Sequence, residues 1–304
     1  MTKRAVLLLA HGTPDKVGEI PEYLRNVVSG RPMPQAVVEE IQHRYALIGQ
    51  SPLTEWTMAQ AKRLEGLLNG ERVYVGMRNW RPYIPEVVRQ MRAEGVTEAA
   101  VICLAPQNSR TSTGLYRRAV EAEAGELKID FTAGWAEHAL LAEAFAERLR
   151  VALEKLRAEI GENPPVLFTA HSVPCRTIAA AEGKPGDPYA TDARRTAELV
   201  AARVPGLKRW YFAFQIQGAS GGEWIGPTVE GTLDALAAEG VKHLILQPIG
   251  FLCDHVEILY DVDIAFKEHA AKLGMRLERP ESLNDSAKLA EALRDLTGKA
   301  FARL

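Results

Sequence analysis

The sequence is poor in cysteine and contains no long apolar run. Its three cysteines, Cys103, Cys175 and Cys253, are odd in number and far apart, without a C-x-x-C pair. This pattern excludes a disulfide framework and a closed four-cysteine metal cluster. No stretch approaches the roughly 20 apolar residues that cross a bilayer, and the apolar run near the N-terminus is too short for a signal peptide. We therefore expect a cytoplasmic protein.

An excess of positive charge is also absent. The formal net charge is −2, with 25% charged and 47% hydrophobic residues. Nucleic-acid-binding proteins usually carry a clear excess of Lys and Arg, so nucleic acid is not expected as a partner. No basic amphipathic helix is evident, and we expect a monomer with at most a weak peripheral membrane contact. At 304 residues the chain is long enough for two domains, each with its own core.

Two pairs of segments repeat half a chain apart. Residues 6–14 read VLLLAHGTP, and residues 166–174 read VLFTAHSVP. A second pair reads EGVTEAAVICLAP from Glu94 and EGVKHLILQPIGF from Glu239. Helical patterns between these strands predict parallel sheets covered on both faces. The repeat therefore predicts two similar α/β domains over residues 1–160 and 161–304, with the C-terminal helix free to pack back on the first domain.

A histidine ends the matched strand in each half, His11 in the first and His171 in the second. In open α/β sheets, ligands bind beyond the carboxyl ends of the strands. The two imidazoles are therefore expected to face one cleft from opposite domains. A single such histidine is more often a local cap of its strand, but two in the same context favour a functional role.

An acidic segment follows the last of these strands, where residues 247–264 read QPIGFLCDHVEILYDVDI. Asp254 is placed to cap a helix, and Asp254, Glu257 and Asp261 share one face of that helix at α-helical spacing. A solvated surface is the plain alternative, but the position at the cleft favours handling of protons or cations. Imidazole suits iron, zinc, copper or nickel, and carboxylates accept protons. His171 opposite Glu257 therefore predicts an open site through which a metal passes, unlike a closed zinc site.

Seven segments resemble the ferrochelatase family, in order along nearly the whole chain. They are HRYALIGQSPLTEWT from His43, GMRNWRPY from Gly76, FTAHSVP from Phe168, GDPY from Gly186, FQIQGASGGEWIGP from Phe214, GFLCDHVEILYDVDI from Gly250 and RPESLND from Arg279. The resemblance implies two Rossmann-like, chelatase-type domains with a porphyrin cleft between them. It implies a lyase that inserts Fe²⁺ into protoporphyrin IX or coproporphyrin III in haem biosynthesis.

The resemblance also implies roles for individual residues. His171 and Glu257 are expected to act jointly on the iron and on the pyrrole protons, supported by Asp254, His255 and Asp261. Ferrous iron is then a substrate, and no cofactor is permanently bound. An iron–sulfur cluster is not expected, because no cysteine follows Cys253. Porphyrin binding is carried over to Arg44, Tyr45, Ser51, Trp80 and Tyr116.

Position 11 departs from the family pattern. Coproporphyrin-using relatives resemble Tyr-Gly-Thr-Pro there, whereas chelatases of the sirohydrochlorin type place a histidine at this strand end. We therefore hypothesise that His11 is a metal ligand across the ring from His171.

Two other positions bear on the substrate and the metal. Ala265 stands where some relatives carry another carboxylate, and the segment NSRTSTGLY from Asn108 is similar to the Ser-Thr-Thr-Gly pattern of protoporphyrin enzymes. The alternatives are a chelatase for another metal or tetrapyrrole, and a non-catalytic haem or metal carrier.

Overall fold

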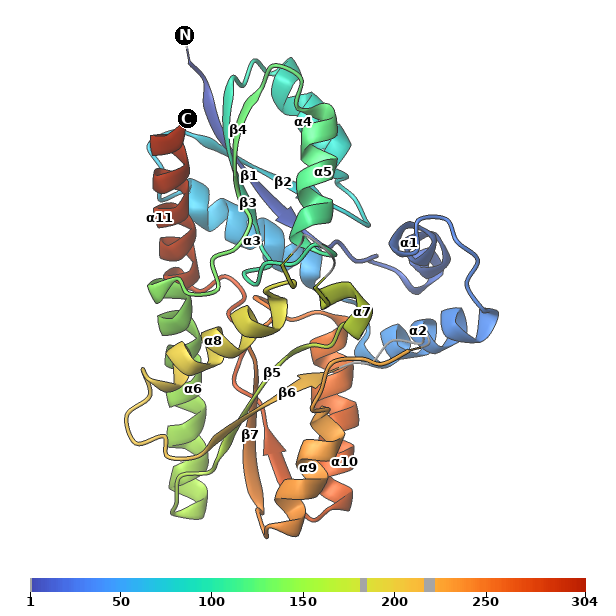
Figure 1. Cartoon of the computed structure of the whole chain (residues 1–304), viewed down its shortest axis with the longest axis vertical. Coiled ribbons are helices and arrows are strands. Elements are labelled where there is room, and N and C mark those ends of the chain that lie inside the picture. The colour runs from blue at the N-terminus through green and yellow to red at the C-terminus, as the bar shows by residue number, and fades with distance from the viewer. Residues whose placement is uncertain (1, 181–184, 216–221) are drawn as a thin grey trace.

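Two parallel four-stranded sheets lie one above the other in a computed structural model of the chain, which describes residues 2–180, 185–215 and 222–304 (Figure 1). The first sheet has the order β2-β1-β3-β4, and the second has the order β6-β5-β7-β8. The strands are β1 (Arg4–Ala10), β2 (Arg72–Met77), β3 (Glu98–Cys103), β4 (Lys128–Thr132), β5 (Val166–His171), β6 (Trp210–Gln215), β7 (His243–Pro248) and β8 (Arg276–Glu278). The identical orders confirm two similar α/β halves.

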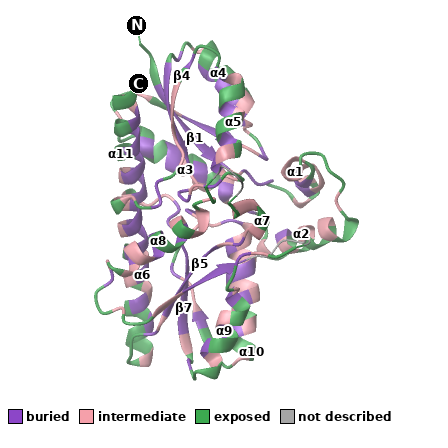
Figure 2. Ribbon diagram, viewed as in Figure 1, coloured by how far each residue is buried: buried purple, intermediate pink, exposed green. Residues whose placement is uncertain are grey.

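The central strands are buried along their length because helices cover both faces of each sheet. All six residues of β3 are buried, and in β1 every residue after Arg4 is buried. Such continuous apolar runs are typical of parallel strands that contact helices on both sides. Figure 2 shows these strands as buried and the outer helix surfaces as exposed. The covering helices include α3 (Leu53–Glu65), α4 (Ile84–Ala93), α5 (Thr113–Ala124), α8 (Tyr189–Ala201) and α9 (Val229–Ala238).

Two long helices cross between the halves. Helix α6 (Ala139–Ile160) packs against α8 and β7 of the second half, and the Gln247 side chain donates a hydrogen bond to the Phe145 carbonyl at 2.9 Å. Helix α11 (Ala287–Arg303) packs on β3 and β4 of the first half. By packing, α6 therefore belongs with the second sheet, although the predicted domain boundary follows it. The repeated motifs predict where strands lie in the sequence. They do not predict which of the two sheets an amphipathic helix covers, because that depends on the path of the chain between the halves.

Helices α1 (Ile20–Val27) and α2 (Gln35–Ile48) project beside the gap between the two sheets (Figure 1). A short helical turn, η1 (Val17–Glu19), precedes them. A small separate core joins them to the first half through Tyr23, Tyr45 and Trp80, and Val256 of the second half packs against it. This unit therefore closes one side of the space between the halves.

The acidic segment differs from the predicted helix. Strand β7 ends at Pro248, and the next helix begins as a π-helix, η2 (Glu257–Phe266), which α10 (Lys267–Lys272) continues. Asp254 precedes this helix, so the expected row of Asp254, Glu257 and Asp261 on one α-helical face is wrong. π-Helical turns occur frequently at functional sites. The remaining short helix is α7 (Cys175–Ile178), and no helix among the described residues is long and apolar enough to cross a membrane.

Candidate active site between the two sheets

A cavity of about 310 Å³ lies where the carboxyl ends of the two sheets face each other. Residues of both halves form its walls, and α1 contributes from the side. The placement agrees with the rule that ligands bind beyond the carboxyl ends of parallel strands. The polar and aromatic lining residues include His11, Tyr23, Arg78, Tyr116, His171, Tyr189, Phe251, His255 and Glu257.

The first wall is centred on His11, directly after β1. Gly12 has φ +79°, and a Cβ there would lie 2.9 Å from Met77 and Trp80 atoms, so only glycine permits this turn. The imidazole Nε2 of His11 lies 2.9 Å from the Tyr23 hydroxyl, and the Asn79 amide nitrogen lies 3.2 Å from Nε2. Burial, with a further contribution from the Arg78 charge, lowers the pKa of His11 to about 3. His11 is therefore a neutral imidazole at any ordinary pH.

The opposite wall carries His171, the last residue of β5. Its Nδ1–H donates a hydrogen bond to the backbone carbonyl of Ser172. This bond leaves Nε2 on the other side of the ring, 3.7 Å from a carboxylate oxygen of Glu257. The Tyr189 hydroxyl donates to the His171 carbonyl at 2.8 Å and holds the strand end in place. A ring fixed in this way presents a lone pair suited to a metal or a proton.

Glu257 is an ionised carboxylate in spite of its burial. Burial raises its pKa, but the charges of His171 and His255 and a hydrogen bond from His255 lower it to about 2. The His255 Nε2 lies 3.4 Å from Glu257, while its Nδ1–H donates to the Cys253 carbonyl at 3.0 Å. The pair of His171 and Glu257 thus places an imidazole beside an ionised carboxylate.

The arrangement is open. Within the part of the chain that the structure describes, no group of three or more His, Cys, Asp or Glu side chains is placed to hold a metal ion. Two adjacent groups, and not a closed cage, therefore face the cavity. Such a pair can accept protons and contact a metal transiently, whereas permanent structural sites supply four protein ligands.

Only some of the expected porphyrin-binding residues lie on the surface of the cavity. Tyr116 lines the cavity. Ser51 is buried and accepts a hydrogen bond at 3.0 Å from Thr13, which lines the cavity. Ser51 therefore lies behind the residues that form the cavity surface. Tyr45 and Trp80 are also buried, and Trp80 packs edge-on against Tyr23. These three side chains support the wall and do not form its surface.

Arg44 lies outside the cavity, on α2. Its guanidinium donates to Asp261 of η2 at 3.2 Å and to Glu40 at 2.9 Å, and it stacks over the Tyr260 ring. Burial raises the pKa of Asp261 to about 7, although Arg44 opposes this shift. The contact joins α2 of the first half to η2 of the second. The ion pair between Arg44 and Asp261 therefore closes the site on the side where α2 meets η2.

Several lining residues are absent from the sequence-based set. Arg78 and Tyr189 lie in the segments GMRNWRPY and GDPY, so the resemblance contained a signal for them. Tyr23 had no such signal, because nothing in a helical pattern shows that its hydroxyl reaches His11. The segment FQIQGASGGEWIGP lies partly outside the described residues, at 216–221.

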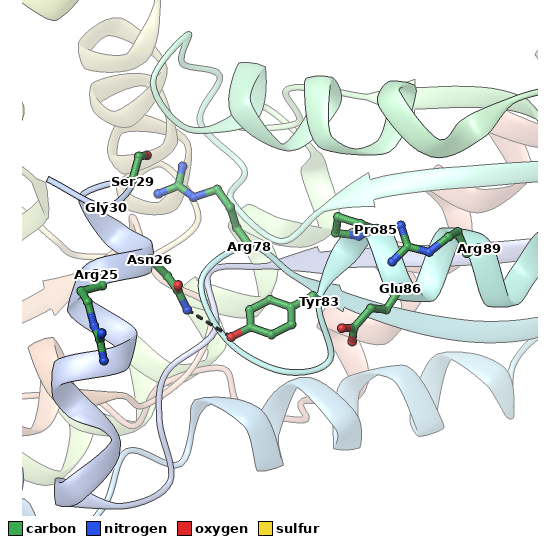
Figure 3. Close-up of a pocket in the computed structure, with 9 residues that line it drawn as sticks. All are labelled: Arg25, Asn26, Ser29, Gly30, Arg78, Tyr83, Pro85, Glu86 and Arg89. Carbon is green, nitrogen blue, oxygen red and sulfur yellow. Dashed lines mark hydrogen bonds between the residues drawn. The ribbon is translucent and has the colours of Figure 1, made fainter.

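A second cavity, of about 530 Å³, lies beside the first and shares Arg78 with it. Figure 3 shows the Arg78 guanidinium pointing toward Ser29, and the Asn26 amide donating to the Tyr83 hydroxyl at 3.1 Å. Arg25 and Arg89 stand on its rim, whereas Glu86 is its one acidic lining residue. Among the described residues, no carboxylate lies within 4.0 Å of the Arg78 guanidinium. This outer pocket is therefore positively charged and suits an anionic group.

Comparison with solved structures identifies the class of fold. The sirohydrochlorin chelatase SirB from Bacillus subtilis subspecies spizizenii, in complex with cobalt, aligns over 98% of this chain and 95% of its own, with a TM-score of 0.59 and 11% identity. CbiX, a terminal enzyme of sirohaem biosynthesis in denitrifying bacteria, aligns over 98% of this chain and 99% of its own, with a TM-score of 0.52 and 14% identity. The fold is that of the two-domain chelatases.

Comparison with sequences identifies the family. The ferrochelatase family model matches residues 3–300. A ferrochelatase of Acidobacterium capsulatum is 61% identical, over 99% of this chain and 96% of the relative. A coproporphyrin III ferrochelatase of a Geobacillus species is 33% identical over 96% of both chains. The chain therefore belongs to the ferrochelatase family, enzymes that insert iron into a porphyrin in haem synthesis.

Proposed function

We propose that His171 and Glu257 carry out ferrous-iron insertion jointly. The observation that carries this assignment is their contact at 3.7 Å on the wall of a cavity between the two sheets. Two N–H protons must leave the porphyrin as Fe²⁺ enters. The neutral porphyrin and Fe²⁺ therefore give a neutral iron porphyrin and two protons. The His171 imidazole is a suitable proton acceptor, and the ionised Glu257 beside it stabilises the departing protons and the entering iron through its negative charge.

His11 is proposed to face the iron from the opposite wall of the cavity. Its pKa of about 3 keeps the imidazole neutral and available as a ligand. The Tyr23 hydroxyl lies 2.9 Å from Nε2, so the ligand role requires this hydrogen bond to break. A His11→Ala variant with an unchanged absorption spectrum of its haem complex would contradict the proposal.

Arg78 is proposed to receive a carboxylate substituent of the ring. It lines both the central cavity and the positively charged outer pocket, and an arginine matches carboxylate geometry. Coproporphyrin III carries four carboxylates and protoporphyrin IX two. In an Arg78→Met variant, we expect the KM for coproporphyrin III to rise more than that for protoporphyrin IX. Equal changes for both rings would remove this support for a carboxylate contact.

Ferrous iron is proposed as a substrate, with no permanently bound cofactor. Only three cysteines are present, and Cys103 and Cys253 are buried, so an iron–sulfur cluster with four sulfur ligands is not proposed. We propose a monomer that acts in the cytoplasm, based on three cysteines that are far apart, with at most weak membrane contact because no basic amphipathic helix is evident in the sequence. Size-exclusion chromatography with light scattering tests the oligomeric state.

Anaerobic iron insertion is the decisive assay, with both rings as substrates. Turnover should fall at least about 100-fold in His171→Ala and in Glu257→Gln, because each removes a group that acts on the reacting atoms. His269→Ala is the matched control, since His269 pairs with Asp234 on the surface at 2.8 Å. Tight haem binding without turnover in the wild-type protein would instead favour a carrier. Wild-type turnover in both variants would refute the assignment of the pair.

A further inference from the structure

The loop from Arg279 to Ser286 joins the two walls of the cavity from behind. It leaves β8 of the second half and leads into α11, which packs on the first half. The loop contains Asn284, which is 4% exposed and has φ +49°. Asparagine adopts this left-handed conformation more readily than other residues with a side chain. The loop therefore holds a buried polar residue in a backbone conformation that few other residue types adopt.

Asn284 makes contacts with both walls. Its carbonyl accepts a hydrogen bond at 2.7 Å from Gln60 of α3, and its backbone N–H donates to Leu252 at 2.9 Å. Its side chain binds Asp254 twice, because Oδ1 accepts from the Asp254 backbone N–H at 2.9 Å and the amide nitrogen donates to the carboxylate at 3.1 Å. Gln60 lines the cavity in the first half, and Asp254 lies three residues before Glu257.

The other oxygen of Asp254 is held by the same loop. Ser282 donates to it at 2.7 Å, and the Arg279 guanidinium lies 3.1 Å from it. The Arg279 guanidinium also donates hydrogen bonds to the Asp263 carboxylate of η2, the shortest at 2.7 Å. The residues on either side of Glu257 are therefore fixed to one loop. Polar groups this well satisfied and little exposed define a single geometry.

We propose that Asn284 is a positioning residue, which sets where the Glu257 carboxylate stands relative to the first half of the molecule. Asn284 is not itself a lining residue of the cavity, and it acts through Asp254. This inference rests on the proposed role of Glu257. Displacement of reacting groups by about 1 Å lowers rates by as much as about 100-fold, so loosening this link lowers kcat without weakening substrate binding.

Asn284→Gly is the first test, because glycine adopts a positive φ without strain and keeps both backbone hydrogen bonds. We expect kcat per haem-binding site to fall about tenfold, with KM for iron and porphyrin within about twofold. Counting haem-binding sites separates positioning from folding, since a purely structural loss reduces the number of sites and not kcat per site. Asp285→Ala is the matched control, because Asp285 links the same loop to α3 through Arg63 at 2.9 Å, on the surface.

An exchange of the two polar groups provides the second test. In Asp254→Asn, an amide replaces the carboxylate that accepts the hydrogen bond from the Asn284 amide nitrogen. The link is weakened, so kcat should fall as it does in Asn284→Gly. Adding Asn284→Asp restores a donor opposite an acceptor and should recover most of the lost kcat. Unchanged kcat in Asn284→Gly, or no recovery in the double variant, would overturn the inference. Glu257→Gln in the same assay separates the two claims, since wild-type turnover there would refute the proposed function instead.

Discussion

Acidification should destabilise the folded protein through His11. Burial, assisted by the Arg78 charge, lowers the pKa of this imidazole from 6.5 to about 3. An unfolded chain takes up a proton on this side chain below pH 6.5, whereas the folded chain does not until about pH 3. The free energy of unfolding therefore falls as the pH drops through this window.

The magnitude follows from the width of the window. At pH 5, which is about 1.5 units below the unfolded pKa, the loss is about 2 kcal/mol at about 1.4 kcal/mol per unit. Glu257 contributes little to this change, because its pKa of about 2 keeps it ionised in the folded state and the unfolded carboxyl is largely ionised at pH 5. The interval from pH 8 to pH 5 therefore isolates the contribution of His11 when a variant is compared with the wild type.

Urea unfolding at pH 8 and pH 5 measures this effect. A His11→Gln variant keeps a polar group near Tyr23 but cannot take up the proton. The wild-type protein should lose about 2 kcal/mol more than the variant between the two pH values. Equal losses would mean that folded His11 accepts a proton near pH 6. They would refute the argument that the cavity holds a neutral imidazole ready for a metal.

Two further changes test the surroundings of the site. Burial raises the pKa of Asp261 to about 7, so the folded state takes up a proton that the unfolded state accepts only near pH 4. Wild-type stability should therefore gain about 3 kcal/mol relative to Asp261→Asn between pH 7 and pH 4 in urea titrations, and parallel curves would contradict this. Arg279→Ala removes the cation beside Asp254 and leaves Asp263 with Lys267 alone, and it should cost about 3 kcal/mol. Arg81→Ala, at an exposed ion pair, should cost less than about 1 kcal/mol, and equal losses would refute the distinction.

Much of the fold and the central pair could be predicted from the sequence. Apolar runs such as VLLLA and VLFTA become parallel strands because their side chains are buried on both faces, and this property is local. The repeat placed His11 and His171 at equivalent strand ends, and the acidic motif supplied Glu257. Those three residues do line one cavity. The family followed from long collinear motifs, and the whole-chain match confirms it.

The tertiary structure alone decided which side chains meet. α6 and α11 have similar amphipathic patterns, and only the path of the chain decides which sheet each one covers. Tyr23 contacts His11 and Asn284 contacts Asp254 because distant segments converge, and no periodicity records such contacts. Tyr45, Ser51 and Trp80 lie behind the cavity wall for the same reason. A sequence specifies burial and local geometry directly, whereas hydrogen-bond partners and shifted pKa values depend on three-dimensional neighbours.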